Sequence, residues 1–431
     1  MKKKVAFHTL GCKLNFVETS TLGKKFLENG FEIVDLNENP DIFILNTCSV
    51  TERANREARQ IIRKSLRKSP NTFVAVTGCY AQLEPEQIAS IDGVDIVLGA
   101  KEKLNFFEHV NSFQKNSVPK IFTSPVDEIT DFNVAFSSEV GDRTRAFLKI
   151  QDGCDFNCTF CTIPLARGES RSQSIEECVK QAKYLADLGF REIVLTGVNV
   201  GDFGKKNNSS FLKLIQELDK VNGINRFRIS SIEPNLLTKE IIDFVFESEK
   251  FCNHFHIPLQ SGNDEILQLM RRRYTTTNYK KILEYIKTKD KTCGIGIDVI
   301  VGFPNETKEH FEETYKFLVE LPATYLHIFT YSERPNTPAI QLENKVEPKI
   351  RFKRNEMLRN LNVKKKFNFY NDFIGKKMEI LIESKLENGF YSGLTTNYIR
   401  VEFDATDDLI NTIQTVEIEK ISSEICKGKI V

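Results

Sequence analysis

Short apolar runs alternate with amphipathic stretches along residues 1–118. The runs KVAFHT, DIFILN, FVAVT and VDIVLG are rich in β-branched and aromatic residues, which is typical of buried strands. Apolar positions at helical spacing lie between or beside them, at residues 16–28, 51–68 and 84–90. Strands and helices that alternate in this way predict an α/β fold, with a doubly wound parallel sheet covered by helices on both faces.

The alternation continues through residues 141–370. Six further apolar runs predict strands: RAFLKIQ, EIVLTG, RFRISS, FHIPLQ, IGIDVIVGF and YLHIFTYS. Because helical stretches separate several of these runs, we expect a full or partial (β/α) barrel. A basic amphipathic helix is predicted over residues 345–370, at the end of this part of the chain.

Residues 371–431 have a different pattern, in which short strands follow one another directly. KMEILIES, GFYSGLT, YIRVEF and TVEIEKIS come after Gly375 and alternate apolar with polar positions. They predict a small antiparallel β-barrel of the kind that binds oligonucleotides. The chain of 431 residues is therefore expected to form three domains, over residues 1–118, 141–370 and 371–431.

The composition is that of an ordinary folded, soluble protein. Hydrophobic residues make up 40% and charged residues 28%, which argues against disorder. No run approaches the ~20 apolar residues that a membrane helix needs, so we expect no membrane partner. The apolar run after Lys2, Lys3 and Lys4 is too short for a secretion signal and contains His8, so we expect a cytoplasmic protein.

The net charge of +1 hides a strong local asymmetry. Residues 51–70, 271–291 and 345–366 together carry 24 basic and 6 acidic side chains, which leaves the rest of the chain acidic. Basic charge concentrated in a few segments suits a polyanion such as RNA, although each segment alone is also typical of a solvated helix face. In the first segment, four arginines recur on or near one face of the predicted helix: Arg53, Arg56, Arg63 and Arg67.

Three of the ten cysteines form a C-x3-C-x2-C loop: Cys154, Cys158 and Cys161. The loop follows the strand RAFLKIQ, so it lies at the C-terminal end of a barrel strand, where active sites are built. Three thiolates can hold three irons of a [4Fe-4S] cluster and leave the fourth iron open. Zinc is the alternative, and it is disfavoured because no histidine lies between His109 and His254 to complete a four-ligand site.

A second set of three cysteines is spread along the predicted N-terminal sheet. Cys12, Cys48 and Cys79 each close a predicted strand, in the segments VAFHTLGC, IFILNTC and FVAVTGC. Because the ends of parallel strands share one edge of a sheet, the three thiols are expected to converge there. The alternative is that they are three small buried hydrophobic residues, which is a common role for free cysteine.

The loop CDFNCTFC, with Phe160 before its last cysteine, resembles the radical S-adenosylmethionine (SAM) superfamily. The resemblance implies that the open iron binds the methionine part of SAM. One electron from the cluster then cleaves SAM and releases a 5′-deoxyadenosyl radical. Such chemistry needs a barrel that shields a reactive radical, in agreement with the predicted fold.

The chain as a whole resembles the methylthiotransferases. GCKLNFVET, NTCSVT and TGCYAQ surround Cys12, Cys48 and Cys79, and they are similar to segments of the family's N-terminal domain. RAFLKIQDGC, CTIPLARGESRS, SSIEP, HIPLQSGND, DVIVGFPNET and FTYSERPNTPA also look like family segments. The resemblance implies a second [4Fe-4S] cluster on these three cysteines, which carries the sulfur to be inserted, and a TRAM-like RNA-binding domain at the C-terminus.

Within that family, GCKLN and NTCSVT are most similar to the branch that methylthiolates C2 of N6-threonylcarbamoyladenosine beside the tRNA anticodon. That branch implies the anticodon loop of tRNA as substrate and a flavodoxin or ferredoxin as reductant. Branches that act on N6-isopentenyladenosine in tRNA, or on an aspartate of a ribosomal protein, remain alternatives. A non-catalytic iron–sulfur protein that binds RNA is an alternative of another class, although two sets of only three ligands argue against closed structural sites.

The resemblance also suggests residues that contact SAM. Phe160 is expected near the adenine, and Glu233 and Gln260 end predicted strands, where they can bond the ribose or the methionine. A strand-capping hydrogen bond is the alternative for both. TGVNVG stands where the wider superfamily has GGE, so Asn199 or the backbone of Gly197 is expected to replace the missing glutamate.

Five other positions carry weaker expectations. Arg272 and Arg273 can meet the SAM carboxylate or RNA phosphates, or else form a solvated helix face. His256 alternates with apolar neighbours and is expected to be a core histidine rather than a metal ligand. Asn305 and Asn336 stand where family members often have glycine. Because asparagine tolerates the left-handed backbone conformation, we expect these turns to be kept.

Overall fold

The structure is a computed structural model that describes residues 2–116, 118–137, 144–406, 408–422 and 424–431. The chain divides into two compact units. The first unit consists of Met1–Ser138, Lys149–Gln173 and Ser332–Ile340, and the second of Glu139–Leu148, Ser174–Tyr331 and Gln341–Val431. The boundary expected at residue 141 lies outside the described residues, and the division into three domains stays a prediction.

A parallel sheet of six strands forms the N-terminal part of the first unit, in the order β2-β1-β3-β4-β5-β6. Its four inner strands are the four apolar runs of the sequence: β1 (Lys4–Thr9), β3 (Ile42–Thr47), β4 (Phe73–Gly78) and β5 (Ile96–Leu98). The edge strands β2 (Glu32–Ile33) and β6 (Lys120–Phe122) were not predicted. Both are short and mostly exposed, so they carry no apolar run that marks them.

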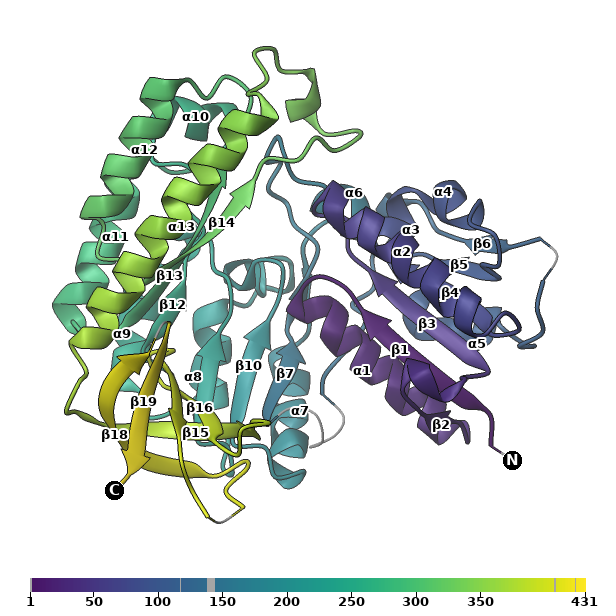
Figure 1. Cartoon of the computed structure of the whole chain (residues 1–431), viewed down its shortest axis with the longest axis horizontal. Coiled ribbons are helices and arrows are strands. Elements are labelled where there is room, and N and C mark those ends of the chain that lie inside the picture. Colours follow the sequence, from purple (N-terminus) through teal and green to yellow (C-terminus); the bar gives the residue numbers. More distant parts are fainter. Residues whose placement is uncertain (1, 117, 138–143, 407, 423) are drawn as a thin grey trace. The chain divides into compact units, whose positions relative to one another are not determined.

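Helices cover both faces of this sheet, as expected for a doubly wound fold (Figure 1). Ala6 of β1 packs in one apolar cluster with Ala58 of α2, whereas the adjacent Phe7 meets Phe26 of α1 on the other face, with ring centroids 5.6 Å apart. The alternation of side chains along a strand therefore divides the core into two layers. The helices are α1 (Lys13–Glu28), α2 (Glu52–Lys68), α3 (Cys79–Leu83), α4 (Pro85–Ala89) and α5 (Phe106–His109).

Six central strands follow the predicted runs and form two sheets of three, in the orders β11-β10-β7 and β12-β13-β14. Single parallel bridges, Phe227–Phe251 and Ser231–His256, join the two sheets, which makes a partial barrel. The strands are β7 (Arg145–Lys149), β10 (Glu192–Thr196), β11 (Arg226–Ile229), β12 (His254–His256), β13 (Gly294–Val301) and β14 (Tyr325–Thr330). Between and after them lie α6 (Ile163–Arg167), α7 (Ile175–Asp187), α8 (Phe211–Asp219), α9 (Lys239–Glu247), α10 (Asp264–Leu269), α11 (Thr276–Lys289), α12 (Lys308–Glu320) and α13 (Pro348–Asn371).

The C-terminal strands close into the expected small barrel, in the order β15-β16-β17-β19-β18 (Figure 1). The expectation of a wholly antiparallel barrel needs a correction, because β17 pairs with β19 in parallel. Five strands in a closed ring cannot alternate direction throughout, so one pair must be parallel. The strands are β15 (Lys377–Lys385), β16 (Tyr391–Thr395), β17 (Arg400–Phe403), β18 (Ile413–Ser422) and β19 (Ile425–Ile430).

The predicted basic helix is α13, but part of its charge faces inward. The Arg354 guanidinium is buried and pairs with the Glu306 carboxylate, and Arg351 donates to the carbonyl oxygen of Tyr331 at 3.1 Å. These arginines hold the fold together and are not available to RNA. The turns expected at the two asparagines are confirmed, because Asn305 has φ = 67° and Asn336 has φ = 62°.

Candidate active site

Cys12, Cys48 and Cys79 follow the C-terminal ends of β1, β3 and β4, three neighbouring strands of the parallel sheet. The loop that holds Cys12 lies directly against Cys48, because a Cβ atom on Gly11 would be 2.7 Å from the Cys48 Sγ. Asn15 fastens this arrangement, since its Nδ2 donates to the carbonyl oxygens of Leu10 (2.8 Å) and of Thr47 (2.9 Å). Parallel strand ends therefore gather these cysteines at one edge, as the sequence predicts.

The three thiols influence one another electrostatically. Cys48 and Cys79 are buried, whereas Cys12 is exposed at the rim. Burial raises the pKa of the Cys48 thiol to about 12, and its neighbour Cys79 adds to this shift. Desolvation by surrounding protein also raises the pKa of the Cys12 thiol, while the positive charge of Arg167 opposes it. Three thiols at one edge of a sheet, with a cation nearby, can bind a metal cluster once their protons leave.

The loop that holds Cys154, Cys158 and Cys161 is prearranged by its backbone. It follows β8 (Gln151–Asp152) and Gly153, where a Cβ atom would lie 2.0 Å from the carbonyl oxygen of Glu169. The backbone N–H groups of Phe156 and Ile163 donate to the Sγ atoms of Cys154 (3.4 Å) and Cys161 (3.5 Å). N–H to sulfur bonds of this kind favour thiolates, which fits the loop to an iron–sulfur cluster.

Both cysteine sets belong to the first compact unit, and direct contacts join their surroundings. Thr162, next to Cys161, donates from Oγ1 to the carbonyl oxygen of Ser49, next to Cys48, at 3.4 Å. The segment Ser332–Ile340 touches both sides, since Arg334 donates to the Ser49 Oγ at 2.8 Å and the Ala339 N–H donates to the Thr159 carbonyl at 2.9 Å. The sequence predicts each set but not this proximity.

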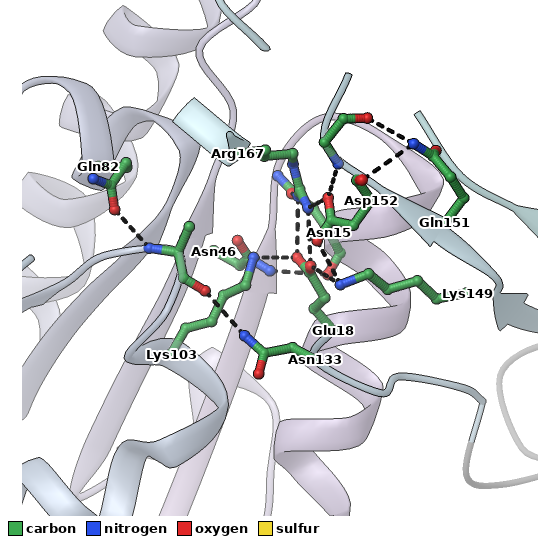
Figure 2. Close-up of polar contacts among 12 residues, drawn as sticks. Asn15, Glu18, Asn46, Gln82, Lys103, Asn133, Lys149, Gln151, Asp152 and Arg167 are labelled. Carbon is green, nitrogen blue, oxygen red and sulfur yellow. Dashed lines mark hydrogen bonds and ion pairs between the residues drawn. The ribbon is translucent and has the colours of Figure 1, made fainter. Parts of the chain in front are cut away.

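A buried ionic network lies beside the two sets, and Figure 2 shows Arg167, Lys149 and Lys103 converging on Glu18 of α1. Arg167 donates from Nη1 to Glu18 (3.0 Å) and to Asp152 (2.9 Å). Lys149 lies 3.1 Å from Glu18 and 2.7 Å from Asp152, and Lys103 also pairs with Glu18. The network ties α1 to residues on both sides of the Cys154 loop, across about 150 positions of sequence.

The pKa values in this network follow from its charges. Although burial raises the pKa of the Glu18 carboxyl, Arg167, Lys103 and Lys149 outweigh burial and hold it well below its ordinary value. The pKa of Asp152 is likewise lowered against burial, chiefly by Lys149 and Arg167. Burial lowers the pKa of the Lys103 ammonium. Glu18 opposes this shift, whereas the neighbouring cations Arg167 and Lys149 add to it.

Sequence reasoning missed this network, although a signal for it was present. Lys149 interrupts the apolar run RAFLKIQ, and a charge within a buried strand needs a partner. Arg167 lies in the segment CTIPLARGESRS, where the sequence gives no sign that the arginine is buried. Charged residues are usually exposed, so nothing local indicated that Glu18 and Lys103 turn inward.

Three polar residues proposed for SAM come together in the second unit. The Oδ1 atom of Asn199 accepts from the Glu233 backbone N–H at 3.3 Å. The Glu233 carboxylate pairs with Arg272, whose Nε donates to the Tyr274 hydroxyl at 2.9 Å. Arg272 is therefore not part of a solvated face, and Glu233 makes no side-chain capping bond. The group offers an amide and a carboxylate from the segments after β10 and β11, and a guanidinium from the segment after α10.

The other expected SAM contacts are placed as follows. Gln260 has φ = 72°, an uncommon conformation for a residue other than glycine and one that is often found at functional sites. Phe160 and Gly197 are half-buried, and Arg273 is exposed. The roles of these four residues in SAM binding stay predictions.

A group of potential metal ligands lies on three neighbouring strands of the second unit. His256 Nε2 is 2.7 Å from the Asp298 carboxylate, and these two groups and His327 offer ligand atoms within 4.8 Å of one another. His256 is partly exposed, with a hydrogen-bonded partner, rather than enclosed in an apolar core. The group can bind a cation in principle, and the Asp298 pairing explains why a histidine is tolerated in this strand.

A three-cysteine loop thus follows the first strand of a partial barrel of parallel strands. The family model of the radical SAM superfamily matches residues 148–318, and the model of the Uncharacterized protein family UPF0004 matches residues 4–99. A solved structure of the radical SAM methyltransferase TsrM from Kitasatospora setae covers 79% of this chain and 77% of its own, with a TM-score of 0.57 and 15% identity. At that identity the likeness concerns the fold alone.

Sequence relatives are more specific. The chain is 40% identical to the threonylcarbamoyladenosine tRNA methylthiotransferase MtaB of Bacillus subtilis, over 99% of this chain and 96% of that protein. It is 31% identical to the tRNA-2-methylthio-N(6)-dimethylallyladenosine synthase of Acetivibrio thermocellus, over 100% of this chain and 91% of that protein. The chain therefore belongs to the radical SAM methylthiotransferases. Membership brings a [4Fe-4S] cluster and SAM as cofactors. No helix in the described part of the chain combines the length and apolarity of a membrane span.

Proposed function

We propose that this chain methylthiolates C2 of N6-threonylcarbamoyladenosine in tRNA, with one [4Fe-4S] cluster on each cysteine set. The proposal is carried by one observation, the 40% identity to a protein of that name over nearly the whole of both chains. Two cysteine sets side by side in one unit support it, since sulfur insertion needs a radical source and a sulfur source close together.

The protein's own residues prepare the site for this chemistry. When bound, the cluster on Cys154, Cys158 and Cys161 supplies with SAM a 5′-deoxyadenosyl radical, and the cluster on Cys12, Cys48 and Cys79 supplies sulfur. The N–H groups of Phe156 and Ile163 stabilise two of the thiolates of the first set. Asn199 and Glu233 would bind the polar groups of SAM, with Arg272 orienting the Glu233 carboxylate. An external flavodoxin or ferredoxin would deliver the electron.

The exposed face of α2 is the proposed guide for the tRNA anticodon loop. The helix begins just after Cys48, with the Thr51 side chain as its N-terminal cap. An unpaired loop lets the target base leave its stack at low cost. Arginines on an exposed face attract phosphates, and such binding weakens steeply with salt. All four arginines expected there are exposed: Arg53, Arg56, Arg63 and Arg67.

The second candidate is methylthiolation of N6-isopentenyladenosine, the dimethylallyl substrate named for several relatives of lower identity. Mass spectrometry of nucleosides and ribosomal proteins from a strain that lacks this chain separates the candidates. We expect the 2-methylthio form of N6-threonylcarbamoyladenosine to disappear and the unmodified nucleoside to accumulate.

The matched control in that experiment is complementation with the Cys154→Ala/Cys158→Ala/Cys161→Ala variant, which should not restore the product, whereas the wild-type chain should. Loss of the methylthio group from N6-isopentenyladenosine or from a ribosomal-protein aspartate would contradict the proposed substrate. An unchanged profile would favour a non-catalytic RNA-binding protein.

A further inference from the structure

The ionic network beside the cysteines has more positive than negative charge. Among the described residues, Lys103, Lys149 and Arg167 form ion pairs with two carboxylates, Glu18 and Asp152, and each of the five side chains is at most 4% exposed. Arg171, which lies 3.3 Å from Asp152 and is 10% exposed, adds a further cation. A buried excess of positive charge is costly unless an anion lies nearby.

One atom of the network lacks a partner. Both Nη atoms of Arg167 are bonded, to Glu18, Asp152 and the Oδ1 of Asn15 at 2.7 Å. Its Nε is buried, and among the described residues no acceptor reaches it. A buried guanidinium N–H without an acceptor costs stability. The Arg167 side chain is therefore held in place by its two Nη atoms, and its Nε–H can still donate to an acceptor.

Arg167 is linked by hydrogen bonds to the loops that hold Cys12 and Cys48. Asn15 accepts from the Arg167 Nη2 at 2.7 Å, and its Nδ2 donates to the carbonyl oxygens of Leu10 and Thr47, which lie just before Cys12 and Cys48 in the sequence. An oxidised [4Fe-4S] core held by three thiolates carries one net negative charge, and reduction adds a second. Such an anion matches the excess cation and offers sulfur atoms as hydrogen-bond acceptors.

We propose that Arg167 is a positioning residue for the cluster on Cys12, Cys48 and Cys79, donating a hydrogen bond from Nε to sulfur and raising the cluster's reduction potential. Glu18, Asp152 and Asn15 fix its guanidinium for this task. The inference rests on the proposed function, because it presupposes a cluster at this set. Positive charge and hydrogen bonds to sulfur both favour the reduced, more negative state.

The test is a redox titration followed by electron paramagnetic resonance, on the full chain with Cys154, Cys158 and Cys161 replaced by alanine. This background leaves only the cluster in question. Arg167→Gln should lower the reduction potential of the remaining cluster by at least ~59 mV, which corresponds to a tenfold change in the equilibrium constant for one electron. Arg167→Lys keeps the charge but loses the Nε donor, so it should give a smaller shift in the same direction.

Arg171→Gln is the matched control, because it removes a cation from the same network without changing the Arg167 side chain. The Arg171→Gln variant should shift the reduction potential only slightly, by less than about a threefold change in the equilibrium constant for reduction. If Arg167→Gln does not fold, the reduction potential of the Arg167→Lys variant is compared with that of Arg171→Gln instead. Iron in the background variant with no difference in potential between the Arg167 and Arg171 variants would overturn this inference alone. A background variant without iron would overturn it together with the second cluster of the proposed function.

Discussion

Replacing Cys12, Cys48 and Cys79 together with alanine is expected to abolish methylthiolation while SAM cleavage continues. The three cysteines gather at one edge of the N-terminal sheet, whereas the Cys154 loop is organised by its own backbone bonds. The methylthio product should fall at least ~100-fold, since whole ligands are lost. The measurement is an anaerobic assay with dithionite, in which 5′-deoxyadenosine and the modified nucleoside are quantified together.

Cys293→Ala is the matched control for this variant. Cys293 is also a buried thiol whose pKa is raised by burial, but it lies directly before β13 and belongs to neither cysteine set. It should retain both 5′-deoxyadenosine formation and methylthiolation. A triple variant that still methylthiolates tRNA would show that the N-terminal cysteines do not supply the sulfur.

Glu18→Gln is expected to destabilise the protein by roughly 3–5 kcal/mol, the range for breaking one side of a buried ion pair. The change leaves Lys103, Lys149 and Arg167 with Asp152 as the one carboxylate of the five-residue network. The variant should unfold at a lower urea concentration, with its slope unchanged. The destabilisation should be greatest at neutral pH, because the pKa of the Glu18 carboxyl is held below its ordinary value.

The pH dependence has a definite sign. A carboxyl with a lowered pKa stabilises the fold above its unfolded pKa of about 4, and this stabilisation is lost as the pH falls. The wild type and Glu18→Gln should therefore approach each other on acidification. Glu217→Gln, in an exposed pair with Lys220, is the control and should cost less than ~1 kcal/mol. Equal stability of the two variants at neutral pH would contradict the role of the network.

Periodicity predicts most of the fold, because the buried parallel strands are contiguous apolar runs and the strands of the small barrel alternate apolar with polar positions. RAFLKIQ and IGIDVIVGF identify β7 and β13 directly. The pattern fails where an element is short or exposed, as in β2 and β6. These two strands form because they pair with the neighbouring strands β1 and β5. The hydrophobic pattern does not predict the parallel pairing of β17 with β19, because strand direction in a closed ring is a property of the whole barrel.

The candidate site divides in the same way. Convergence of Cys12, Cys48 and Cys79 follows from a general rule about parallel strand ends. The proximity of the two cysteine sets depends on contacts such as Thr162 with Ser49, which join distant segments and leave no local pattern. The sequence does not predict the burial of these charged residues either, because an isolated lysine or glutamate is expected at the surface.

Iron and sulfide analysis of anaerobically purified protein tests the two-cluster account most directly. The wild type should contain about eight irons with matching sulfide, and alanine replacement of either cysteine set should leave about four. About four irons in both the wild type and the Cys12→Ala/Cys48→Ala/Cys79→Ala variant would contradict the account. The N-terminal cysteines would then hold no cluster, and the proposed source of sulfur would be lost.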